Sequence, residues 1–217
     1  YCRRIAESFD LSLVERGKYT YQFTSKKNSF QGHNYNILRD ILDSLGLRGL
    51  SKHKRIPEEY KYASASQRLA LLQGLMDADG TCGMSGQAAF YSVCKELCED
   101  VADVVRSLGA NATVNIKNGR YKGEHHLSHL VYIPRNFIAN PFRLTRKAER
   151  FVRGENRARP LMMKTFESIG IYDCTCIRVA ASDSLFLTRN YVPTHNTSAG
   201  VYASVLHLTG EYPDGWE

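Results

Sequence analysis

Two acidic residues after an apolar run are the first candidates for chemistry in this sequence. Asp77 and Asp79 follow the leucine-rich residues 66–75, and Gly80 comes directly after them. The leucines recur at helical spacing, which predicts a helix that ends at the acidic pair. The helix dipole disfavours carboxylates at a C-terminus, and a bound divalent cation would reverse that penalty. We therefore expect a metal site at this helix end.

Small residues recur every four positions along the same helix. They are Ala70, Gly74 and Ala78, which share one helical face. Glycine inside a helix costs about 1 kcal/mol relative to alanine, so Gly74 needs a packing reason. A second helix packed against this face would supply one. The alternative is an ordinary buried helix that ends at a glycine.

A second group with chemical potential lies near the end of the chain, at His195, Asn196 and Thr197. The side-chain amide of Asn196 can attack its own peptide carbonyl, which closes a succinimide and cuts the bond to Thr197. His195 is placed to protonate the leaving amine or polarise the carbonyl. Thr197 would be the nucleophile that accepts the upstream chain. The alternative is an exposed loop without chemistry.

Composition favours a globular protein with a polyanionic partner. The 217 residues are 43% hydrophobic and carry a net charge of +7. This charge points first to nucleic acid, and the alternative is an indifferent basic surface. No apolar run reaches membrane-spanning length and no leader opens the chain, so we expect no membrane partner and a cytoplasmic location in a bacterial or phage-infected cell. Residues 1–4 lack an initiator methionine, and we expect a fragment that starts in mid-protein.

The elements that must position these groups alternate between helices and strands. Periodicity predicts strands over 17–25, 81–93, 112–117 and 127–133, and helices over 34–47 and 94–108. Ser92 is the expected N-cap of the last helix, Cys94 and Cys98 are expected core thiols on its apolar face, and Asn118-Gly119 is a strong hairpin signal. Further strands are expected over 174–179 and 185–188. This pattern predicts an α/β (α+β) fold.

Basic side chains concentrate along the expected hairpin and the segment that follows it. The candidate DNA contacts are Lys117, Arg120, Lys122, Arg143 and Lys147. Lysine and arginine neutralise phosphate charge and release counterions, which supplies most non-specific affinity for DNA. The alternative is a solvated charged face.

Residues 72–80 resemble the LAGLIDADG motif of homing endonucleases, with departures at Gln73 and Met76. Residues 54–57, Arg68 and residues 106–109 resemble further blocks of the DOD-type endonuclease domain found inside inteins. The resemblance implies a helix–sheet unit that binds double-stranded DNA. Asp79 would be the Mg²⁺ ligand, Asp77 would support it, and Lys54 would steady charge near the phosphate or be a plain surface lysine.

Double-strand cleavage in that family uses two motif helices, each of which delivers one carboxylate. Only one motif is present in this sequence. Residues 1–50 resemble the tail of a first half whose motif is missing, and residues 51–159 resemble the second half. The resemblance thus implies that the site needs the missing N-terminal intein half or a second copy of the chain.

Residues 176–179, 185–187 and 192–197 resemble the C-terminal splicing blocks of inteins. This implies that residues 160–196 carry C-terminal β-strands of a Hint splicing domain. Cys176 stands where many inteins have aspartate. In one intein class a cysteine there is the first nucleophile, with a threonine where Thr194 stands, and the sequence leaves both roles open.

Residues 197–217 resemble the segment after the phosphate-binding loop of phage terminase large subunits, and so imply a terminase-like ATPase as host in cis. The function expected from both resemblances is Mg²⁺-dependent cutting of DNA joined to autocatalytic release at Asn196. Two alternatives remain: a DNA-binding module that does not cut, and a remnant that only splices.

Overall fold

The computed structural model describes residues 2–18, 20–25, 36–121, 124–154, 165, 167, 170–171, 173, 177 and 179–194. Of residues 120, 121 and 124–126 it describes the backbone alone. Helices alternate with antiparallel strands in this part of the chain, and the predicted α/β (α+β) class is confirmed. None of the described helices combines the length and apolar character that a membrane crossing needs.

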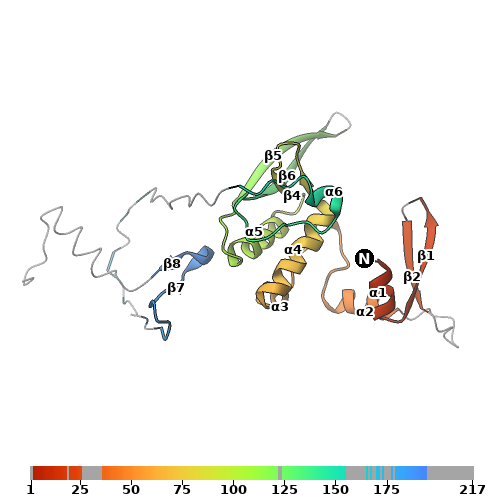
Figure 1. The fold of residues 1–217 in the computed structure, drawn as a ribbon, viewed down its shortest axis with the longest axis horizontal. Coiled ribbons are helices and arrows are strands. Elements are labelled where there is room, and N and C mark those ends of the chain that lie inside the picture. The colour runs from red at the N-terminus through yellow and green to blue at the C-terminus, as the bar shows by residue number, and fades with distance from the viewer. Residues whose placement is uncertain are drawn as a thin grey trace, which may run out of the picture.

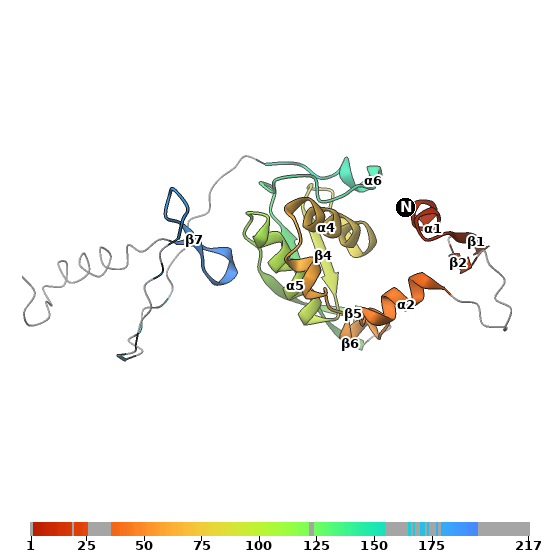
Figure 2. The same cartoon turned by 90° about the horizontal axis from the view of Figure 1, so that it is seen from below.

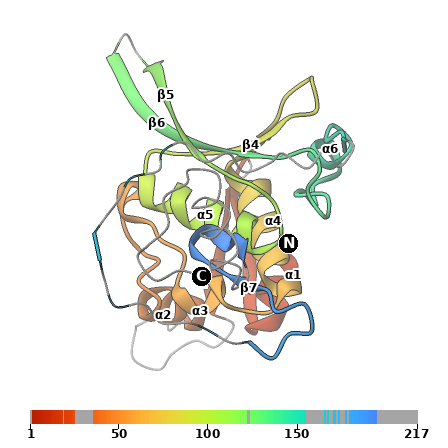
Figure 3. The ribbon, with the colours of Figure 1, turned by 90° about the vertical axis from the view of Figure 1, so that its left-hand side faces the viewer.

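A four-stranded antiparallel sheet organises the middle of the chain. Its spatial order is β3-β4-β6-β5, built from β3 (Gly80–Cys82), β4 (Ala88–Ser92), β5 (Val114–Tyr121) and β6 (Glu124–Ile133). Helices α4 (Ala65–Asp79) and α5 (Lys95–Ser107) lie side by side against one face of this sheet (Figures 1 and 2). Seen from the side, the other face carries no helix of the described residues (Figure 3). Among the described residues, this sheet face, called the open sheet face below, is thus left without a helix.

A capping box fixes the start of helix α4. Ser64 accepts a hydrogen bond from the Gln67 amide, and the Gln67 side chain accepts one from the Ser64 amide, which is a capping box. Leu72 and Met76 are fully buried against the sheet. The helix runs through Asp79, so the predicted position of the acidic pair at its C-terminal end is confirmed.

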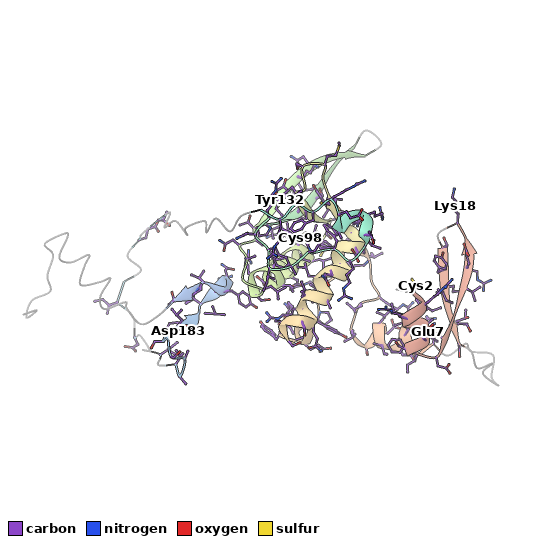
Figure 4. The ribbon with its side chains drawn as sticks, viewed as in Figure 1. Cys2, Glu7, Lys18, Cys98, Tyr132 and Asp183 are labelled. Carbon is purple, nitrogen blue, oxygen red and sulfur yellow. The ribbon has the colours of Figure 1, made fainter. Side chains whose placement is uncertain are left out.

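The core lies between α4, α5 and the sheet. Phe90 of β4 and Val131 and Ile133 of β6 point toward the helices and are fully buried. Cys98 of α5 is also fully buried and Cys94 nearly so, which confirms the two predicted core thiols. Figure 4 shows Cys98 among the packed side chains below the sheet. Burial raises the pKa of the Cys98 thiol to about 11, so it stays protonated at neutral pH.

The prediction that Ser92 is the N-cap of α5 is wrong. The helix begins at Lys95, and Cys94 is the residue before it. Ser92 still accepts a hydrogen bond, because its hydroxyl oxygen lies 3.1 Å from the Cys94 amide nitrogen. Ser92 therefore forms a turn with Cys94 just before the helix and does not cap the helix itself.

The predicted hairpin is confirmed, since β5 and β6 pair antiparallel, but its turn does not lie at Asn118-Gly119. Asn118 pairs with Leu127 and Gly119 with His126 inside the β5–β6 ladder, which continues to the pair Tyr121 and Glu124. The connection is therefore residues 122–123. Regular pairing with a partner strand outweighs the weak strand propensity of asparagine and glycine at this point.

The N-terminal part forms a helix, a hairpin and a second helix. These elements are α1 (Cys2–Ser8), β1 (Leu11–Gly17), β2 (Thr20–Ser25) and α2 (Ile37–Ser44). The predicted strand over 17–25 corresponds to β2, and its antiparallel partner β1 was not anticipated. Asn36 caps α2 through its side-chain oxygen, and Gly46 follows with a φ of 65°. The order helix, hairpin, helix repeats in α5, β5, β6 and the short α6 (Thr145–Ala148).

Five short elements complete the described part of the chain. Residues Ser51–His53 form the 3-10 helix η1, and Glu58–Lys61 form the helix α3 before α4. Near the C-terminal end, β7 (Phe186–Leu187) pairs with β8 (Pro193–Thr194) around the 3-10 turn η2 (Arg189–Tyr191). The strand expected over 185–188 is thus present, though shorter.

Candidate functional site

The two acidic residues of the motif have different surroundings. Asp77 is half-buried, and its Oδ1 atom accepts hydrogen bonds from the backbone amides of Arg143 and Leu144, each 3.1 Å long. Asp79 is exposed at the last position of α4. The geometry therefore makes Asp77 an anchor for residues 143–144 and leaves the Asp79 carboxylate accessible.

Lys147 caps the acidic end of α4. Its Nζ atom donates to the carbonyl oxygens of Met76 at 3.0 Å, Asp77 at 2.7 Å and Gly80 at 2.7 Å. The Met76 carbonyl also accepts the Gly80 amide hydrogen, and a cation at this end of α4 opposes the helix dipole. An ammonium group has three donors, so a phosphate contact by Lys147 would have to replace one of these bonds.

Burial lowers the pKa of Lys147, and the neighbouring charge of Arg146 lowers it further, while Asp77 and Asp79 oppose the shift. The two carboxylates thus lie within electrostatic reach of the ammonium group. The helix end therefore combines two negative side chains with one positive side chain that is fixed by the backbone.

Gly80 lets the chain turn from α4 directly into β3. A Cβ at this position would lie 2.5 Å from the Met76 carbonyl oxygen and 2.7 Å from the Met76 Cα. Backbone atoms cannot move away as a flexible side chain can. The glycine that ends the motif is therefore required by a close backbone approach.

The acidic end fits part of a Mg²⁺ site. Magnesium is usually held by one or two carboxylates together with waters and substrate phosphates. Asp79 supplies one accessible carboxylate, while Asp77 already accepts two amide hydrogens. Among the described residues no group of three or more His, Cys, Asp or Glu side chains could hold a metal. A complete site on this end needs ligands from elsewhere.

The face with the small residues of α4 is open. Gly74 and Ala78 are exposed, and apart from α4 itself no described atom lies within 4 Å of an ideal Cβ at Gly74. The described chain therefore gives no packing reason for Gly74. No helix among the described residues packs against Gly74.

The open sheet face carries polar and aromatic side chains next to this helix end. Alternation along the strands places Thr81, Tyr91, Lys117 and Tyr132 on the face away from α4 and α5. The Nζ atom of Lys117 lies 5.3 Å from the centre of the Tyr91 ring, and Tyr132 is 48% exposed (Figure 4). This surface offers both cationic and stacking groups to a ligand.

Asp100 is a buried charged residue that sequence patterns missed. Its carboxylate accepts from Arg55 at 2.9 and 3.1 Å, from the Ile56 amide at 2.9 Å and from Lys61 at 3.1 Å. Burial raises the pKa of Asp100, but these hydrogen bonds outweigh burial and the net shift is downward. The network ties the connector before α4 to α5. An aspartate on the apolar face of a predicted helix was the available signal.

The other predicted site residues lie in several places. Lys54 is exposed on the connector, and its carbonyl oxygen accepts from the Cys94 thiol at 3.2 Å. Arg143 is exposed, and its Nε donates to the Gln73 side chain at 2.7 Å. Thr194 is half-buried in β8 opposite Phe186. The residues that fall outside the described part are Lys122, Cys176, His195, Asn196 and Thr197, as does the side chain of Arg120.

Sequence comparison identifies the central unit. The family model for a LAGLIDADG-like domain matches residues 66–143. The replicative DNA helicase DnaB of Mycobacterium intracellulare is 31% identical over 170 residues, which are 76% of this chain and 29% of the helicase. The chain thus spans less than a third of the length of that relative.

Among solved structures, a variant of I-DmoI in complex with its target DNA in the presence of Mg is similar. It is 15% identical, with a TM-score of 0.29, and the match covers 57% of this chain and 80% of that one. The matched family segment begins inside α4 and runs through the whole sheet to Arg143, so it includes the acidic helix end and the open sheet face. Residues 66–143 of this chain therefore match the family of LAGLIDADG-like domains.

Proposed function

We propose that the LAGLIDADG-like domain is half of an intein-encoded homing endonuclease that cuts double-stranded DNA with Mg²⁺. The observation that carries this proposal is the acidic end of α4, where Asp79 is exposed while Asp77 and Lys147 are held by the backbone. A metal ion held by Asp79 would polarise a scissile phosphate and activate water. The chain's own part is to hold that carboxylate rigidly at the edge of the sheet.

The open sheet face supports DNA as the substrate. Lys117 and Tyr91 form a cation–π pair on this face, and Arg143 is exposed beside the acidic helix end. The chain has a net charge of +7, which favours association with a polyanion. Such a surface makes phosphate contacts that position a duplex.

The open small-residue face supports a two-helix site. A second helix could approach closely there, because Gly74 presents no side chain and has space above it. We propose that this second helix comes from the missing N-terminal intein half or from a second copy of the chain. It would bring the second carboxylate to the metal.

Nicking of a supercoiled plasmid that carries the uninterrupted host site tests the proposal. We expect the wild-type chain, together with an N-terminal intein segment that supplies the second motif helix, to nick this plasmid with Mg²⁺ and not with EDTA. Asp79→Asn should abolish nicking, whereas Asp103→Asn, a surface change on α5, should not. Nicking that survives Asp79→Asn would refute the metal assignment. Specific binding of the plasmid without any nicking would favour the alternative of a DNA-binding module that does not cut.

We further propose that the C-terminal part acts in protein splicing, with cyclisation of Asn196 and release of residues 197–217. The pairing of Thr194 with Phe186 in a β-hairpin just before His195 and Asn196 supports this proposal, because it holds the preceding strand. Thr197 would be the accepting nucleophile, and Cys176 either a first nucleophile or a hydrogen-bonding group. If splicing is absent, the wild-type chain and Asn196→Ala will give the same products when each is co-expressed with an N-terminal segment.

The host of the intein is the last element of the proposal. We propose a terminase-like ATPase, on the basis of residues 197–217. The helicase relative is an alternative kind of host, because the chain spans only 29% of it and matches over most of its own length. The sequence that flanks the chain in its gene decides between these two hosts.

A further inference from the structure

Gln73 is a departure from the motif and makes specific contacts. It stands where the name LAGLIDADG has its first alanine, a residue that could make no side-chain hydrogen bond. The Nε2 atom of Gln73 donates to the Asn140 carbonyl at 2.9 Å, and its Oε1 atom accepts from Arg143 Nε at 2.7 Å. Both ends of the amide are therefore used, which only a side chain with a donor and an acceptor can do.

Asp77 reinforces the same attachment one helical turn later. Residues 73 and 77 share one face of α4, and Asp77 accepts from the Arg143 and Leu144 amides. The backbone of residue 143 is thus held by Asp77, and its side chain is held by Gln73. Arg143 consequently has a defined direction even though it is exposed.

The bond to Gln73 uses one donor of the Arg143 guanidinium. A guanidinium has five N–H donors, of which one is on Nε and four are on the two terminal nitrogens. The two terminal nitrogens can then make a paired contact with a phosphate. An arginine fixed at its Nε loses less conformational entropy on binding than a mobile one.

We propose that Gln73 is a positioning residue that sets Arg143 for contact with a DNA phosphate beside the acidic end of α4. The inference rests on the proposed function, because it needs a DNA duplex on this side of the domain. It adds a role for a residue at which this chain differs from the motif. Gln73 itself touches no DNA in this arrangement.

The salt dependence of binding by the full chain to a DNA duplex tests the inference. The logarithm of the association constant falls linearly with the logarithm of the salt concentration, and loss of one phosphate contact makes this slope less steep by about 0.9. We expect this drop for Arg143→Ala and a drop in the same direction for Gln73→Ala. Adding Gln73→Ala to Arg143→Ala should change nothing further, since the two residues act through one contact.

Gln67→Ala is the matched control, because Gln67 lies on the same helix but caps its other end. It should lower the melting temperature and leave the salt slope unchanged. A wild-type slope in Gln73→Ala, or an equal drop with and without Arg143, would overturn the inference while the proposed function stands. If the wild-type chain bound no DNA, both the inference about Gln73 and the proposed function would be refuted.

Discussion

Replacement of Asp100 by alanine should strongly destabilise the domain. Asp100 is 2% exposed in α5 and accepts hydrogen bonds from Arg55, Lys61 and the Ile56 amide. Truncation would remove the carboxylate that these three donors share and leave the donors behind. The cost therefore comes from groups that lose their partner rather than from the lost carboxylate alone.

The three partners contribute unequally to this cost. The Arg55 side chain is 55% exposed, so water can replace most of what it loses. The Lys61 side chain is only 11% exposed, although Glu58 remains beside it. The Ile56 amide is buried, and an unpaired buried amide costs about 1–3 kcal/mol. Together with the loss at Lys61, we expect about 3–5 kcal/mol, which is the usual range when one member of a buried ion pair is removed.

Urea unfolding of the wild-type chain, Asp100→Ala and Asp100→Asn measures this cost. Asparagine keeps one acceptor for the Ile56 amide and should cost about half as much as alanine. Asp103→Ala is the control on the same helix, since Asp103 forms a partly exposed pair with Arg106 and should cost less than about 1 kcal/mol. If Asp100→Ala cost no more than Asp103→Ala, the network would be a surface feature and this reasoning would fail.

Three further predictions concern the same domain. The pKa of Asp100 lies below its ordinary value of 3.8, so its contribution to stability is complete above that pH and is lost as the pH falls through the lowered pKa; urea titrations below about pH 4 should show a steeper loss for the wild type than for Asp100→Asn. Lys147→Met should cost about 2–3 kcal/mol in urea unfolding by releasing three carbonyls, and Lys147→Arg should cost less, whereas equal losses would mean that packing and not hydrogen bonding matters. Gly80→Ala should lower the melting temperature because of the backbone contact at Met76, while Gly74→Ala should raise it, because alanine adds up to about 1 kcal/mol of helix propensity to the free energy of unfolding; the reverse order would contradict both placements.

Periodicity predicted the helices of the domain well. The apolar spacing in α4 and α5 is strong enough that both helices appear where they were expected, and the acidic pair falls at the end of α4. Cys94 and Cys98 were placed correctly in the core for the same reason. Burial of one helical face requires apolar residues at helical spacing, and the prediction used this spacing.

Local signals were less reliable where pairing with a distant segment decides the structure. Asn118-Gly119 is a good turn sequence by itself, but it lies inside a strand because β6 pairs with it along its length. Asp100 looks like a surface charge until Arg55 and Lys61 are brought beside it by the fold. Both residues are 39–45 positions from Asp100 in the chain, and no local pattern connects them.

The two aspartates of the motif show how far a shared pattern can carry a site prediction. Both are carboxylates at one helix end, and the motif implies that Asp77 supports Asp79 as the metal ligand. In the fold, Asp77 holds the segment that carries Arg143, while Asp79 faces solvent. Gln73 adds a contact with the same segment that the motif does not encode.

A change at Asp77 would therefore displace Arg143 as well as weaken the acidic end, so loss of activity in such a variant cannot by itself identify a metal ligand. Asp79→Asn is free of this ambiguity, because the Asp79 side chain is exposed at the last position of α4 and is not one of the anchors of residues 140–147.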